Sequence, residues 1–176
     1  PGRPRFVAGS MGPGTRLPSL GQVSWAQLEA SYRLQALGLI QGGVDVLLLE
    51  TAQDVLQLKA GISGIRAAQR ELGSAVPVMA QVTIETTGTM LVGTDIAAAL
   101  TALEPMGLAA IGLNCATGPQ QMAPWVSYLC KHTHLPVSVL PNAGLPELVG
   151  GKAAYPLGPD EFATWVARFV EEDGVG

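Results

Sequence analysis

Apolar strand-like segments and amphipathic helix-like segments alternate along the whole of this 176-residue chain. Runs rich in leucine and β-branched residues predict five strands, at 6–10, 44–49, 76–84, 108–113 and 135–140. Helical spacing and capping signals predict five helices, at about 24–40, 55–72, 94–103, 117–132 and 158–173. Strands that are apolar on both faces and alternate with such helices indicate a parallel sheet covered by helices. We therefore expect an α/β protein with five consecutive β/α units.

Two of the predicted helices begin with a capping-box pattern. In this pattern the side chain of the first residue accepts a hydrogen bond from the backbone N–H three residues later. The side chain of that later residue in turn accepts a hydrogen bond from the backbone N–H of the first. Ser24 with Gln27 and Thr117 with Gln120 have this spacing. We therefore expect Ser24 and Thr117 to cap the starts of their helices.

Two architectures fit the alternation of elements: an open doubly wound sheet, and part of a (β/α)₈ barrel. The first predicted strand is not followed by G-x-G-x-x-G, and G-x-x-x-x-G-K-[ST] occurs nowhere in the chain. The nucleotide-binding form of the open sheet therefore has no support in the sequence.

Charge and cysteine content argue against several classes of function. The net charge is −4 and the pI is about 5.1, which disfavours a nucleic-acid partner or an anionic membrane surface. No uncharged apolar run approaches about 18 residues, so no membrane span is expected, and the first residues do not resemble a signal peptide. Two cysteines, Cys115 and Cys130, do not make a secreted disulfide framework. We expect a reduced, cytoplasmic protein.

Polar residues follow each predicted strand. They are Ser10, Glu50, Glu85, Asn114 with Cys115, and Asn142. Barrel enzymes assemble their active sites at these carboxyl ends, although any strand that leaves a core also needs a polar residue there. The pattern alone favours the second explanation for Ser10 and Glu85, favours a functional Glu50, and leaves Asn142 open between a site residue and a turn residue.

Cys115 is the one candidate nucleophile or metal ligand that stands at a strand end. The helix predicted to start at Thr117 would bring backbone amides near the thiol and favour its thiolate. The alternative is an inert buried cysteine, which is common. Cys130 is interpreted as a packing residue of a helix, and the spacing of His132 and His134 does not bring both rings to one metal.

Four segments together resemble the homocysteine S-methyltransferase family, and in particular the homocysteine-binding module of cobalamin-dependent methionine synthases. They are VAGSMGP at 7–13, DVLLLET at 45–51, GLNCA at 112–116 and PNAGLP at 141–146. The resemblance implies a (β/α)₈ barrel with a zinc ion held by three cysteines and by the sulfur of homocysteine. Zinc then keeps the homocysteine thiol as a thiolate, which accepts a methyl group and gives methionine.

The resemblance also implies roles for single residues. Cys115 follows Gly-Leu-Asn and corresponds to the first zinc cysteine. Glu50 corresponds to the glutamate that binds the homocysteine amino group. Asn142 corresponds to an asparagine beside the metal, which is expected to bind substrate and to ligate zinc when substrate is absent. Ser10 and Asn114 are expected to belong to the same homocysteine-binding site.

The chain departs from the family pattern in one large respect. The other two zinc cysteines of the family lie in a Gly-Gly-Cys-Cys-Gly motif, which does not occur in residues 1–176. We expect residues 1–176 to be a single partial barrel domain, units three to seven of eight and incomplete at both ends. The expected partners are homocysteine, the missing barrel strands, and cobalamin and folate domains of a longer polypeptide, which would handle methylcobalamin and methyltetrahydrofolate. Alone, the chain is expected to bind zinc weakly or not at all, to be inactive as a methyltransferase, and to expose two sheet edges that favour association.

Several alternatives stay open on the sequence. Similar segments occur in fusions with methylenetetrahydrofolate reductase and in methyltransferases that use S-methylmethionine or betaine, so the methyl donor is undetermined. A truncated β/α domain without catalytic activity, kept for binding or assembly, has the same pattern. An open-sheet protein that binds a small molecule without a metal would also show this pattern.

Overall fold

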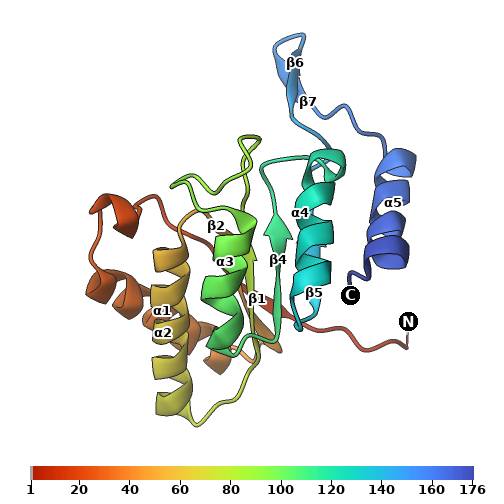
Figure 1. Ribbon diagram of the computed structural model, residues 1–176. Coiled ribbons are helices and arrows are strands. Elements are labelled where there is room, and N and C mark those ends of the chain that lie inside the picture. The colour runs from red at the N-terminus through yellow and green to blue at the C-terminus, as the bar shows by residue number, and fades with distance from the viewer. Residues whose placement is uncertain (1) are drawn as a thin grey trace.

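A five-stranded parallel sheet forms the centre of the structure, a computed structural model that describes residues 2–176 (Figure 1). Its strands are β1 (Ala8–Met11), β2 (Val46–Ala52), β3 (Val78–Val82), β4 (Ala110–Asn114) and β5 (Val137–Leu140). They lie side by side in sequence order, from β1 to β5. A doubly wound sheet reverses its strand order at a switch point, and no reversal occurs among these strands. The prediction of five consecutive β/α units of a barrel is confirmed.

Helices connect and follow the strands. They are α1 (Trp25–Gln41), α2 (Val55–Leu72), α3 (Ile96–Leu103), α4 (Pro119–His132) and α5 (Pro159–Arg168), with short helices at Pro18–Leu20 (η1) and Glu104–Met106 (η2) and a π-helical turn at Phe169–Asp173 (η3). Right-handed crossovers between neighbouring parallel strands place connecting helices on the same face of a sheet. No helix in residues 2–176 has the length and apolar character needed to cross a membrane.

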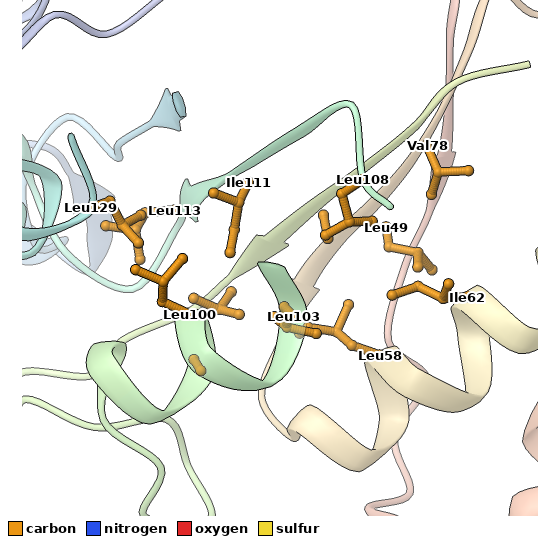
Figure 2. Packing of buried hydrophobic residues seen from close by; sticks show 14 of the residues in the cluster. Leu49, Leu58, Ile62, Val78, Leu100, Leu103, Leu108, Ile111, Leu113 and Leu129 are labelled. Carbon is orange, nitrogen blue, oxygen red and sulfur yellow. The ribbon is translucent and has the colours of Figure 1, made fainter. Parts of the chain in front are cut away.

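The hydrophobic core lies between the helices and one face of the sheet. Figure 2 shows Leu58 and Ile62 of α2 and Leu100 and Leu103 of α3 beside strand residues such as Leu49 and Ile111. Strand residues alternate between the two faces, so Leu49 and Ile111 point to the helices while Glu50 and Gly112 belong to the other face. That other face is not covered by helices of the described chain and is called the open face below.

One of the two predicted capping boxes is wrong. Ser24 caps α1 together with Gln27 as expected. At α4, however, the cap is Gly118, and the buried hydroxyl of Thr117 has no partner among residues 2–176. Pro119 explains the shift, because proline favours the first helical position and holds the residue before it in an extended conformation. A Cβ on Gly118 would lie 2.9 Å from the Cα of Gly144, so this cap has no room for a side chain.

The segment between β5 and α5, for which the sequence predicted neither a strand nor a helix, contains a hairpin. Its strands are β6 (Glu147–Val149) and β7 (Lys152–Ala154), which pair antiparallel. Gly150 and Gly151 both have positive φ angles, as a tight two-residue hairpin turn requires. The hairpin extends away from the sheet in Figure 1.

A glycine in β4 allows close side-chain packing across the open face. Gln81, Gly112 and Ser138 are paired in register on β3, β4 and β5. The Gln81 amide donates to the Ser138 hydroxyl at 2.8 Å, from strand to strand over Gly112. A Cβ built on Gly112 would lie 1.8 Å from the backbone oxygen of Ser138. Glycine at this position therefore lets β4 and β5 approach each other closely.

Replacing this glycine should separate β4 from β5. We expect Gly112→Ala to lower the free energy of unfolding by about 3 kcal/mol or to prevent folding. The added methyl group would clash with the backbone of β5, which cannot move aside as a flexible side chain could. The matched control is Gly38→Ala in α1, where a Cβ meets nothing within 4 Å and a gain of roughly 0.5–1 kcal/mol is expected. Urea titration of both variants measures the difference. Equal stability of the two variants would contradict the packing described here.

Candidate functional site at the carboxyl ends of the strands

Three of the residues expected in the site are joined by hydrogen bonds. The Ser10 hydroxyl donates to Oε1 of Glu50, and Nδ2 of Asn114 lies 3.4 Å from Oε2 of the same carboxylate. These residues come from β1, β2 and β4. The strand ends therefore converge on the Glu50 carboxylate, as the barrel interpretation predicts.

Asn114 stands at the centre of this group and is almost fully buried, with 2% of its surface exposed. Its Oδ1 accepts the backbone N–H of Thr51 at 2.8 Å. Its Nδ2 lies 2.7 Å from the Thr51 hydroxyl oxygen and 3.3 Å from Sγ of Cys115. One carboxamide thus contacts both the carboxylate and the thiol of the candidate site.

Left-handed backbone conformations concentrate at the same place. Among residues 2–176, the non-glycine residues with positive φ are Thr51, Cys115 and Ala116, at 59°, 59° and 57°. Such angles are uncommon for residues with a side chain and least expected for a β-branched one such as Thr51. Each costs about 1–3 kcal/mol, and such residues cluster at functional sites, where the surroundings hold them in place.

The loops after β4 and β5 are tied to each other by backbone hydrogen bonds. Cys115 N–H donates to the Leu140 oxygen, and Asn142 N–H donates to the Thr117 oxygen, both at 3.1 Å. Asn142 is half-buried. Its segment therefore lies beside the one that carries Cys115, at the same edge of the sheet.

The residue that β3 contributes to the hydrogen-bonded group is not Glu85, the polar residue that the sequence placed at its end. Glu85 lies in a turn in which its N–H donates to the Thr89 oxygen, and it does not join the hydrogen-bonded group. The buried Thr83 does, because its hydroxyl donates to the backbone oxygen of Asn114 at 3.1 Å. The reason is that β3 ends at Val82, earlier than the predicted end at 84. Thr83 is therefore the residue at the strand end.

Sequence reasoning missed both Thr51 and Thr83 as members of the site. A weak signal existed for each. Thr51 directly follows Glu50, the polar residue that closes the second strand, and Thr83 is a polar residue inside an apolar run. Neither signal indicates which strand end the side chain would face.

Cys130 and His132 both make packing contacts on α4. Cys130 packs against the hydrophobic core from α4, and burial, together with the Asp173 carboxylate, raises the pKa of its thiol. His132 stacks on Tyr128 with ring centroids 4.0 Å apart. These contacts agree with the packing role expected for Cys130.

The residues described here do not make a complete metal site. Among residues 2–176, no group of three or more His, Cys, Asp or Glu side chains is placed to hold a metal ion. At the strand ends they supply one sulfur donor, Cys115. A tetrahedral zinc site of the three-cysteine type needs two more thiolates.

Comparison with known proteins supports the interpretation of these motifs. The family model of homocysteine S-methyltransferase matches residues 2–176. The methionine synthase of Mycobacterium tuberculosis is 54% identical over 175 residues, which cover 99% of this chain and 15% of that protein. The methionine synthase of Mycobacterium leprae is 52% identical over 175 residues, with 99% and 14% covered. The chain therefore spans about a seventh of the length of these relatives.

Solved structures share the fold. The homocysteine methyltransferase MmuM from Escherichia coli in its apo form superposes with a TM-score of 0.65 at 24% identity, covering 78% of this chain and 48% of that protein. Its oxidised form gives a TM-score of 0.67 at 20% identity, covering 97% and 54%. Because the family model matches nearly the whole chain and the motifs meet at one edge of the sheet, the chain belongs to the homocysteine S-methyltransferase family.

Proposed function

We propose that this chain binds homocysteine and supplies one zinc ligand within a homocysteine S-methyltransferase that forms methionine. The observation that carries the proposal is the hydrogen-bonded group of Glu50, Asn114 and Cys115. It brings a carboxylate and a thiol from the ends of two non-adjacent strands to the same carboxamide. Homocysteine itself carries an ammonium group and a thiol, which are the natural partners of a carboxylate and of a thiolate-bound metal.

Glu50 is suited to hold the ammonium group. An ionised carboxylate has about four acceptor positions, and charge-assisted bonds to an ammonium group are about twice as strong as neutral ones. Ser10 donates to one Glu50 oxygen and Asn114 lies near the other, which leaves lone pairs on both oxygens for a ligand. Ser10 then orients the carboxylate and stands at the edge of the proposed substrate site.

Cys115 is proposed as one of the zinc ligands, with the remaining thiolates supplied from outside this chain. When bound, zinc would stabilise the thiolate of homocysteine at neutral pH. The role of Cys115 is to hold the metal at the strand ends, beside the carboxylate. Asn142, on the adjoining loop, is proposed to contact substrate and to occupy a metal position when substrate is absent.

The rest of the barrel is proposed to come from the same longer polypeptide. Within residues 2–176, β1 and β5 each have one edge without a strand partner. A cavity of about 420 Å³ lies beside β5, lined by Met79, Ala110 and Ser138 of the open face and by the C-terminal Val175 and Gly176. Further strands of a closed barrel would cover both edges and this face. A protein of this kind would be cytoplasmic.

We propose methylcobalamin as the methyl donor, with methyltetrahydrofolate as its source, because the motifs resemble the module of cobalamin-dependent methionine synthases. The identity of 54% and 52% to two methionine synthases favours a methionine-forming enzyme of that kind over one that uses S-methylmethionine or betaine. These cofactors would bind to other domains of the longer protein.

The 176-residue chain alone is expected to bind zinc weakly or not at all, because one thiolate leaves most of the coordination shell unfilled. Elemental analysis after dialysis against zinc-free buffer measures this. One tightly held zinc ion per chain would show that residues within 1–176 complete the site.

Replacing Cys115 should abolish methylation in the full-length protein. We expect Cys115→Ser to lower kcat/KM for homocysteine by at least about a thousandfold, since the metal that generates the thiolate would be lost. Cys130→Ser is the matched control and should stay within about threefold of the unchanged protein. Full activity of Cys115→Ser would refute the zinc-ligand role.

A further inference from the structure

We propose that Asn114 is a positioning residue and not a substrate ligand: with Thr51 it fixes the spacing between Glu50 and Cys115. This inference rests on the proposed function, because the spacing matters for a ligand with an ammonium group at one end and a thiol at the other. It revises the expectation that Asn114 itself contacts homocysteine.

The hydrogen-bonding capacity of the Asn114 side chain is already used within the protein. A carboxamide has two N–H donors and one oxygen acceptor. The two N–H bonds of Nδ2 face three acceptors, on Glu50, Thr51 and Cys115. Oδ1 accepts a hydrogen bond from the Thr51 N–H, and the Thr83 hydroxyl lies 3.5 Å from it. With 2% of its surface exposed, Asn114 also offers almost no area to a ligand.

The bonds of Asn114 connect strands that do not touch as neighbours. β3 lies between β2 and β4 in the sheet. Beyond the end of β3, Asn114 on β4 reaches Thr51 on β2 with two bonds of 2.8 and 2.7 Å. Thr83 supports the bridge from β3, since it donates to the backbone oxygen of Asn114. The same strand ends also meet where the Thr51 hydroxyl lies 3.9 Å from Sγ of Cys115, a longer contact than either bond of the bridge.

The conformation of Thr51 makes the bridge possible. The pairing of β2 with β3 shifts register between Leu49 and Ala52, so Thr51 lies in a bulge, and its φ is 59°. Bulges re-aim side chains next to active sites. Here the bulge gives Asn114 both the N–H and the hydroxyl of Thr51. Because Glu50 directly precedes Thr51, the direction of the Glu50 carboxylate depends on the same bonds.

Amide hydrogen exchange on the 176-residue chain tests the bridge directly. In the unchanged chain the Thr51 amide should be protected, and in Asn114→Ala it should exchange at least about tenfold faster, since its acceptor is gone. Amides of the β3–β4 ladder should keep their rates. Asn114→Asp, which keeps the acceptor oxygen, should preserve the protection of Thr51. Unchanged exchange at Thr51 in Asn114→Ala would overturn the inference.

Kinetics of the full-length protein test the positioning role. Thr51→Ala removes the hydroxyl and should raise KM for homocysteine by about fivefold to tenfold, with kcat within about twofold and zinc content unchanged. Thr51→Ser keeps the hydroxyl and should restore KM. Thr101→Ala is the matched control, because Thr101 is exposed and its hydroxyl donates to the Ala97 oxygen within α3, and it should leave KM unchanged.

The possible outcomes separate this inference from the proposed function. An unchanged KM in Thr51→Ala, or a parallel fall in kcat, zinc content and melting temperature that Thr51→Ser does not rescue, would overturn the positioning role. An unaltered full-length protein that does not methylate homocysteine would instead refute the proposed function. The exchange rate of the Thr51 amide is independent of any activity.

Discussion

The pair of hydrogen bonds between Asn114 and Thr51 joins the ends of two strands that are separated by a third. Through it the carboxylate of Glu50 and the thiol of Cys115 share a single buried carboxamide. The cost of this arrangement is visible in the backbone, where Thr51 and Cys115 both adopt left-handed conformations. Ending two strands does not require left-handed conformations at Thr51 and Cys115, so their strain points to a function of these strand ends.

The rest of the sheet brings these strand ends together. Sequential order without a reversal sends every connecting helix to one face and leaves the open face for side chains of the barrel interior. On that face Gly112 keeps β4 close to β5 while Gln81 reaches Ser138 above it. The loops after β4 and β5 are then near enough for Cys115 and Asn142 to belong to one edge.

The alternation of strands and helices could be predicted from the sequence because it follows from strong local patterns. The parallel sheet that they imply places Ser10, Glu50 and Asn114 at one edge, but the pattern alone favours a structural role for Ser10, and the family resemblance is needed to place Ser10 and Asn114 in one site. The predictions that were wrong depend on the residue at which a strand ends or a helix begins. An earlier end of β3 makes Thr83 the site residue instead of Glu85, and proline moves the start of α4 past the predicted cap. Register and strand ends are set by packing between elements, which a single sequence does not reveal. The bulge at Thr51 is of this kind, because it exists only relative to β3.

The proposed role of Glu50 is to recognise the amino group of homocysteine in the site that Cys115 belongs to. The most direct measurement compares, by calorimetry on the full-length protein, the affinity for homocysteine with that for 4-mercaptobutanoate, which lacks only the amino group. We expect the unchanged protein to prefer homocysteine by roughly tenfold to a hundredfold, as for a hydrogen bond to a charged group. In Glu50→Gln the preference should fall to a few-fold. An equal preference in both proteins would contradict recognition of the amino group by Glu50.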